Sequence, residues 1–236
     1  GKIIYSVSRG CALKNLVCII IFSFLFLPTK IHAESLVEST FNIEAGTYRP
    51  SSERIARSLS KADFSSNAWL WSMDKRDSLH KNGRRDSVLI VPKKSSSKDM
   101  YLIIWFHGLG GFTEKGFNQR IIPQMNRLYK DGISFALALP EMPWSTNTST
   151  KRGRQSMVWR EKGSLESYVE QVRVRLRQRA VAEGESELGS LKIVIVGHSA
   201  GGSALMSASR EGGLCRINPH AVIFSDASYG SWLDRA

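Results

Sequence analysis

The stretch that decides the fold is Leu191 to Gly202, which reads LKIVIVGHSAGG. Five of its first six residues are apolar and most are β-branched, so they predict a strand buried on both faces, as parallel strands are. This strand runs directly into Gly197-His-Ser199-Ala-Gly201, where small residues let the chain turn sharply. Small residues also follow the turn and predict the start of a helix. We therefore expect a strand, a tight turn that presents Ser199, and a helix.

Strand-like and helix-like patterns alternate through the rest of the chain. The apolar spacing predicts helices over 117–129, where Pro123 favours a late start or a kink, over 164–184, and from Gly202 onward. This alternation predicts an α/β fold, with a mostly parallel sheet and helices on both faces. The predicted strands are 87–91, 101–106, 133–139, 191–196 and 221–225.

Residues of chemical interest follow these strands at their carboxyl ends, the edge at which such sheets bind ligands. His107 and Gly108 follow the strand at 101–106, and Asp226 follows the strand at 221–225. Trp144 and Trp159 lie in the segment after the strand at 133–139. We interpret the two tryptophans as candidates for lining a pocket, with ordinary packing as the alternative.

Two motifs together resemble the α/β-hydrolase family over about Ser87 to Ala236: the stretch around Ser199 and the sequence HGLGG at 107–111. The resemblance implies that Ser199 is the nucleophile. It also implies that Ala200 and either Leu109 or Gly110 donate the backbone N–H groups of an oxyanion hole. The residues that would support this geometry are His107, Gly108, Gly197, His198 and Gly201.

A nucleophilic serine needs a histidine base and a carboxylate that orients it. The family order is serine, acid, histidine, but the only histidine after Ser199 is His220. That residue begins the strand at 221–225, roughly 16 Å from its carboxyl end. We therefore expect the catalytic histidine and the last strands of the sheet to lie beyond Ala236, in a chain that is a fragment at both ends. Asp226 is a candidate for the acid; the alternative is a capping or pocket-lining role.

The N-terminal 33 residues have the pattern of a secretory signal peptide. Basic residues precede an apolar run at 16–27, and a small-residue ending at Ala33 is followed by the first acidic residue, Glu34. The apolar run is too short to cross a bilayer as a helix. We expect a cleaved leader at 1–33, a polar lead-in at 34–86 partly packed on the domain, and an incomplete hydrolase domain at 87–236.

Cleavage would leave a basic chain with one cysteine. The leader holds four of the 33 Lys and Arg and none of the 21 Asp and Glu, so +8 of the formal +12 remains. It also holds Cys11 and Cys18, so Cys215 would remain as an odd cysteine, which in a secreted protein implies a disulfide partner elsewhere. The arginines of 173–179 fit a solvated helix face, so we expect no nucleic-acid binding and at most weak association with an anionic envelope or membrane surface.

The sequence thus predicts a secreted or periplasmic serine hydrolase that cleaves a small-molecule or lipid carboxylic ester through an acyl-enzyme on Ser199. One alternative is a serine peptidase on the same fold. The other is a non-catalytic hydrolase-fold protein that serves as a binding or envelope-associated module. No His, Cys or carboxylate spacing resembles a set of metal ligands, so no metal or cofactor is predicted.

Overall fold

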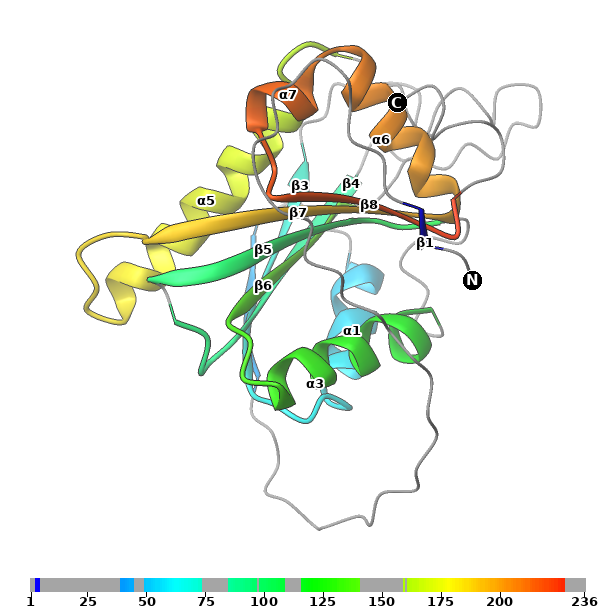
Figure 1. The fold of residues 1–236 in the computed structure, drawn as a ribbon. Helices are drawn as coiled ribbons and strands as arrows, with labels where there is room; N and C mark the ends of the chain where they lie inside the picture. Colours follow the sequence, from blue (N-terminus) through cyan, green and yellow to red (C-terminus); the bar gives the residue numbers. More distant parts are fainter. Residues whose placement is uncertain are drawn as a thin grey trace.

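The computed structural model describes residues 3–4, 39–44, 49–73, 85–96, 98–108, 116–140, 159 and 161–227. Within these residues an eight-stranded sheet forms the centre of the molecule (Figure 1). Its strands are β1 (Ile3–Ile4), β2 (Thr40–Ile43), β3 (Ser66–Met73), β4 (Arg85–Pro92), β5 (Asp99–Phe106), β6 (Phe135–Pro140), β7 (Ser190–His198) and β8 (Ala221–Ser225).

The strand order in the sheet is β1-β8-β7-β5-β6-β4-β3-β2. The four strands β6, β5, β7 and β8 are parallel, and β4 runs antiparallel to both β6 and β3. At the two ends, β2 is parallel to β3 and β1 is antiparallel to β8. Every strand predicted from the sequence is present, and the prediction of a mostly parallel α/β sheet is confirmed.

Helices cover both faces of the sheet, as predicted. In Figure 1, α1 and α3 lie on one face, and α5, α6 and α7 lie on the other. Pro123 is the second residue of α3, at the point where the π-helix η1 passes directly into the α-helix, and proline cannot donate a helical hydrogen bond there. The helices are α1 (Arg49–Leu59), the π-helix η1 (Phe117–Ile121), α3 (Ile122–Lys130), α5 (Ser164–Ala182), the 3-10 turn η3 (Ser199–Gly201), α6 (Gly202–Arg210) and α7 (Gly213–Ile217).

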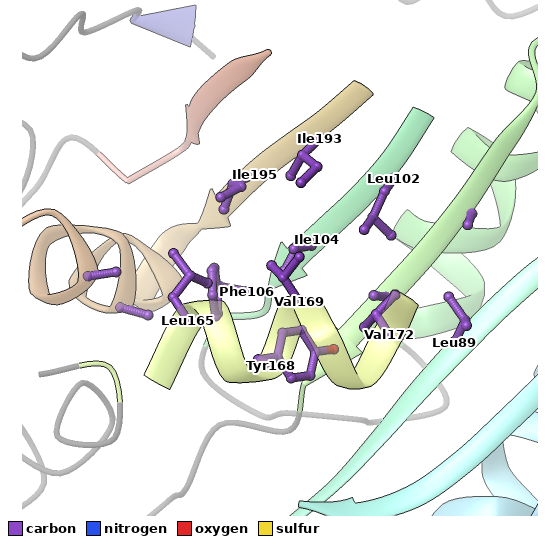
Figure 2. Close-up of a cluster of buried hydrophobic side chains, with 14 of the residues drawn as sticks. Leu89, Leu102, Ile104, Phe106, Leu165, Tyr168, Val169, Val172, Ile193 and Ile195 are labelled. Atoms are coloured by element: carbon purple, nitrogen blue, oxygen red, sulfur yellow. The ribbon is translucent and has the colours of Figure 1, made fainter. Parts of the chain in front are cut away.

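The larger hydrophobic core lies between α5 and the central strands (Figure 2). Leu165, Val169 and Val172 occupy the inner face of α5 and point toward Ile104 of β5 and Ile195 of β7. All five side chains are buried, and each contributes roughly 1.5–3 kcal/mol by leaving water. This packing fixes the central strands whose carboxyl ends carry the residues of interest.

Part of the segment expected as a polar lead-in belongs to the sheet. β3 pairs with β4 along its whole length, and Trp69 and Trp71 are buried in the core. On the other face, Ile55 and Leu59 of α1 are buried beside α3. The segment therefore contributes two strands, β2 and β3, and a helix, α1, to the domain, because its apolar residues have a sheet to pack on.

The expected solvated face of α5 is wrong for two of its arginines. Arg175 is buried, lies 3.8 Å above the ring of Trp71, and donates from both Nε and Nη2 to the carboxylate of Glu44. Arg179 is buried as well and donates to the carbonyl oxygen of Ser95 at 2.7 Å. Burial is tolerated because each guanidinium has partners that replace water.

The expected signal peptide lies almost wholly outside the described residues. Its two described residues, Ile3 and Ile4, pair with the far edge of β8. Cys215 is disulfide-bonded, and the two other cysteines of the sequence, Cys11 and Cys18, lie outside the described residues. Cleavage after Ala33 would cut the peptide chain between these two cysteines and Cys215. In the part of the chain that the structure describes, no helix has the length and apolarity to cross a bilayer.

Candidate active site

Ser199 occupies the sharp turn between β7 and α6, as the sequence predicts. Its φ is +53°, in the left-handed region, whereas His198 before it is extended, with φ −96° and ψ 128°. A serine held in this region stores roughly 1–3 kcal/mol of strain, and such strain is typical of functional sites. The turn therefore has the strand–turn–helix context that a nucleophile elbow requires.

The two glycines that flank Ser199 are required by close packing. A Cβ on Gly197 would lie 2.7 Å from Cδ1 of Leu205, so the glycine allows α6 to pack tightly against β7. A Cβ on Gly201 would lie 2.1 Å from the carbonyl oxygen of Phe106, so this glycine allows the helix start to lie against the end of β5. The turn is thus locked to the neighbouring strand as well as to its own.

The chain that leaves β5 passes directly beside Ser199. A Cβ on Gly108 would lie 2.8 Å from Cβ of Ser199 and 3.1 Å from its Oγ. Leu109 and Gly110, expected as oxyanion-hole donors, follow Gly108 and lie outside the described residues. Ala200 is buried in η3, at the beginning of a helical segment, where the first N–H groups have no partner within the helix.

His107 stabilises the path of this loop. Its side chain is buried, and its Nδ1–H donates to the carbonyl oxygen of Gly108 at 2.7 Å. Burial lowers the pKa of His107 from 6.5 to about 4, and the hydrogen bond to Gly108 offsets only part of that effect. His107 is therefore neutral at physiological pH and holds the backbone where the loop begins.

His198 contacts an arginine, Arg120, that no sequence pattern singles out. Its ring stacks on Trp105, with centroids 6.0 Å apart, and its Nε2 lies 2.9 Å from Nη1 of Arg120 on η1. Burial and the charge of Arg120 lower the pKa of His198, and Asp226 acts in the opposite direction. No local motif marks Arg120, because η1 and β7 are brought together only by the tertiary structure.

Asp226 and His220 lie at opposite ends of β8. His198 pairs with Ser225, so Asp226 leaves the sheet beside Ser199; it is exposed and its φ is +50°. His220 precedes the strand, and its ring lies against Tyr101, with centroids 6.0 Å apart. The structure thus brings Asp226, but not His220, to the edge that carries Ser199.

The two candidate pocket tryptophans have different outcomes. Trp159 is 2% exposed and makes edge-to-face contacts with Phe106 and Tyr168, with centroids 4.8 and 5.7 Å apart. It belongs to the hydrophobic core behind the site. Trp144 lies outside the described residues.

Among the residues that the structure describes, no three His, Cys, Asp or Glu side chains are grouped so that they could hold a metal ion.

Comparison with known proteins finds only distant structural similarity. No protein-family model matches the sequence, and no curated protein matches it. Among solved structures, a carboxyl esterase from Bacillus coagulans is similar over 66% of this chain and 43% of its own, with 13% identity and a TM-score of 0.38. An S-formylglutathione hydrolase from Agrobacterium tumefaciens is similar over 69% and 57%, with 15% identity and a TM-score of 0.39.

A fungal esterase from Rhizomucor miehei is similar over 77% of this chain and 52% of its own, with 16% identity and a TM-score of 0.38. The chain spans about half the length of these solved structures. At such identities and TM-scores, these similarities do not extend to activity. The hydrolase-like fold of this chain follows from its own sheet order and from the strand–turn–helix at Ser199.

Proposed function

We propose that this protein is a serine hydrolase that cleaves carboxylic esters through an acyl-enzyme on Ser199. The observation that carries the proposal is the left-handed conformation of Ser199 at the exit of a central parallel strand, with Gly108 against its side chain. A strained serine in this position supports nucleophilic catalysis, because the turn presents Oγ away from the strand. The substrate proposed is a small-molecule or lipid ester.

The reaction has two stages that pass through the same site. Ser199 Oγ attacks the ester carbonyl carbon while its proton passes to a general base, and the carbonyl oxygen becomes an anion. The N–H of Ala200 and one from Leu109 or Gly110 bind that anion, and each such donor typically lowers the barrier by ~3 kcal/mol. The C–O bond then breaks, and the alcohol leaves with the proton. Water attacks the acyl-enzyme in the same way and releases the acid and Ser199.

Asp226 is the proposed acid of the triad. Its position beside Ser199 at the carboxyl edge of the sheet supports this role. The proposed base is a histidine that follows Asp226 in the whole protein, since His220 precedes β8 at the other edge of the sheet. Replacing Asp226 with Asn in the whole protein is expected to lower kcat by roughly 10³- to 10⁴-fold if it orients that histidine. A loss below ten-fold would assign the acid to another residue.

The decisive experiment is active-site labelling of the full-length protein that contains this chain. We expect a fluorophosphonate probe to label the wild type and the control Ser167→Ala, whose serine is exposed on α5, but not Ser199→Ala. Labelling that persists in Ser199→Ala overturns the proposal. An unlabelled wild type favours the non-catalytic binding protein instead. Rates on matched p-nitrophenyl esters and p-nitroanilides separate an esterase from a peptidase.

Secretion and surface association are also proposals. The leader pattern at 1–33 supports export to the periplasm or the medium, and the remaining charge of +8 supports weak contact with an anionic envelope. N-terminal sequencing of the exported protein is expected to begin at Glu34. The same sample on a non-reducing gel shows whether a cleaved leader stays attached through Cys215.

A further inference from the structure

The stretch 109–115, which includes the proposed oxyanion-hole donors, is flanked in the sequence by two segments that contact the turn at Ser199. On its N-terminal side, Gly108 lies against Ser199 itself. On its C-terminal side, η1 carries Arg120, whose Nη1 lies 2.9 Å from Nε2 of His198, the residue before Ser199. We propose that Arg120 and His198 form a positioning pair that holds η1 in register with the turn that carries the nucleophile. The inference rests on the proposed function.

The donor and the acceptor of this contact are fixed by chemistry. A guanidinium can only donate, so Nε2 of His198 accepts, and a neutral His198 carries its proton on Nδ1. The Nδ1 atom faces Gly108, where a Cβ would lie 3.1 Å from it. The other side of the ring is stacked on Trp105. The imidazole is therefore held between β5, the start of the loop and η1, and it connects all three.

The π-helical form of η1 contributes to the placement of Arg120. Phe117 and Ile121 are buried and anchor η1 in the core beside α1 and α3, whereas Arg120 is on the exposed side. A π-helical turn contains one more residue than an α-helical turn, and removing a residue from a helix rotates the following side chains by about 100°. Arg120 lies within this wider turn, while Phe117 and Ile121 hold the other face of η1 in the core.

The pair requires a neutral His198, since a protonated ring cannot accept a hydrogen bond from arginine. Three ionisable groups face the ring from the elements packed around it: Arg120 on η1, Asp226 after β8 and His107 after β5. Burial and Arg120 lower the pKa of His198, and Asp226 raises it. The contact is therefore intact at neutral pH and is lost when the pH falls below that lowered pKa.

The test measures fluorophosphonate labelling and ester hydrolysis in the full-length protein. We expect Arg120→Met and His198→Leu each to lower the labelling rate and kcat by about 10- to 100-fold, the scale of a small misplacement of catalytic groups. KM should change by less than about two-fold, since the pair does not bind substrate. The double variant should be no slower than either single variant, because both remove the same contact.

A conservative variant and a matched control distinguish positioning from general damage. His198→Gln keeps an acceptor near the position of Nε2 and should recover most of the rate lost in His198→Leu. Arg127→Met removes an exposed arginine from neighbouring α3 and should behave as wild type. Thermal unfolding identifies any variant that fails to fold. If Arg120→Met is such a variant, the comparison of His198→Gln with His198→Leu still tests the pair. NMR of His198 should show the Nδ1–H form and a higher pKa in Arg120→Met.

The inference and the proposed function can fail separately. If the wild type is labelled and Arg120→Met is labelled equally fast, the inference is wrong and the proposed function stands. Additive losses in the double variant, or a His198→Gln as slow as His198→Leu, overturn the inference in the same way. If the wild type is not labelled, the proposed function fails and the inference fails with it.

Discussion

The carboxyl edge of the sheet and the buried side of α5 are both closely packed, but by opposite means. At the edge, Gly108 and Gly201 bring backbone so near to its neighbours that a single methyl group would overlap them. On α5, Arg175 inserts one of the longest side chains between Trp71 and Glu44. The first region depends on missing side-chain atoms, and the second depends on partners for a buried charge. Substitutions should therefore fail for different reasons in the two regions.

The largest expected effect is that of Gly201→Ala at the edge. Its Cβ would lie 2.1 Å from the carbonyl oxygen of Phe106, a backbone atom that cannot rotate away. We expect the free energy of unfolding to fall by ~3 kcal/mol or more in urea denaturation. The control is Gly132→Ala, at φ +69° with no atom within 4 Å, which should cost only about 1 kcal/mol. Equal costs would show that space is not what Gly201 provides.

The next effect comes from His107, a buried neutral group at the carboxyl edge, whereas the buried groups Arg175 and Arg179 of α5 are cations. The pKa of His107 is lowered to about 4 in the folded protein, so the unfolded chain binds more protons between pH 6.5 and 4. The contribution of His107 to the free energy of unfolding is therefore fully present above about pH 6.5, and it decreases as the pH falls toward 4. We expect a loss of about 2 kcal/mol between pH 7 and pH 5 from this residue.

His107→Asn provides the comparison, since its amide can still donate to Gly108 but does not titrate. Urea denaturation at the two pH values should show a smaller decrease in the variant than in the wild type. An identical decrease would assign the acid sensitivity to other groups.

On α5, Arg175→Met should destabilise the fold by roughly 1–2 kcal/mol, through loss of the contact with Trp71 and of the bonds to Glu44. The matched control is Arg177→Met, because Arg177 lies two residues further along α5 and pairs with Glu170 while both side chains are about half exposed. Its effect should stay within about 0.5 kcal/mol. Thermal unfolding of the two variants measures the difference directly, and similar midpoints would contradict the buried role of Arg175.

The smallest effect concerns the backbone of Ser199. Ser199→Gly should be more stable than Ser199→Ala by about 1 kcal/mol, because glycine adopts φ +53° without the strain that a Cβ causes. Both variants remove the proposed nucleophile, so neither should be labelled by the fluorophosphonate. If the alanine variant proves the more stable of the two in urea, the turn is not strained in solution.

The two regions also differ in how well the sequence predicted them. The strand–turn–helix around Ser199 was predictable because its cause is local: apolar residues for a buried strand, and small residues where the chain must turn. The positions of β5 to β8 were predictable for the same reason. The conformation at Ser199 and the close approach of Gly108 are the structural counterparts of that local pattern.

The parts that sequence reasoning missed depend on distant partners. Arg175 looks like a surface residue until Glu44, far earlier in the chain, and Trp71 are placed beside it. β3 was missed because its apolar residues stand among polar ones, and only pairing with β4 shows them to be core. Arg120 reaches His198 across two elements that are separate in the sequence. Charge and periodicity along one segment carry no information about such contacts.

The register that pairs Phe106 with Gly197 also affects how the protein emerges from the ribosome. β4, β5 and β6 can assemble early, but the other edge of β5 has no partner until β7 has been synthesised, about 90 residues later. At ordinary rates of translation this interval lasts roughly 5–20 seconds. During that time an apolar central strand exposes an unpaired edge, the kind of surface that aggregates or recruits chaperones. The strand that completes the turn at Ser199 is therefore also the one that ends this vulnerable period.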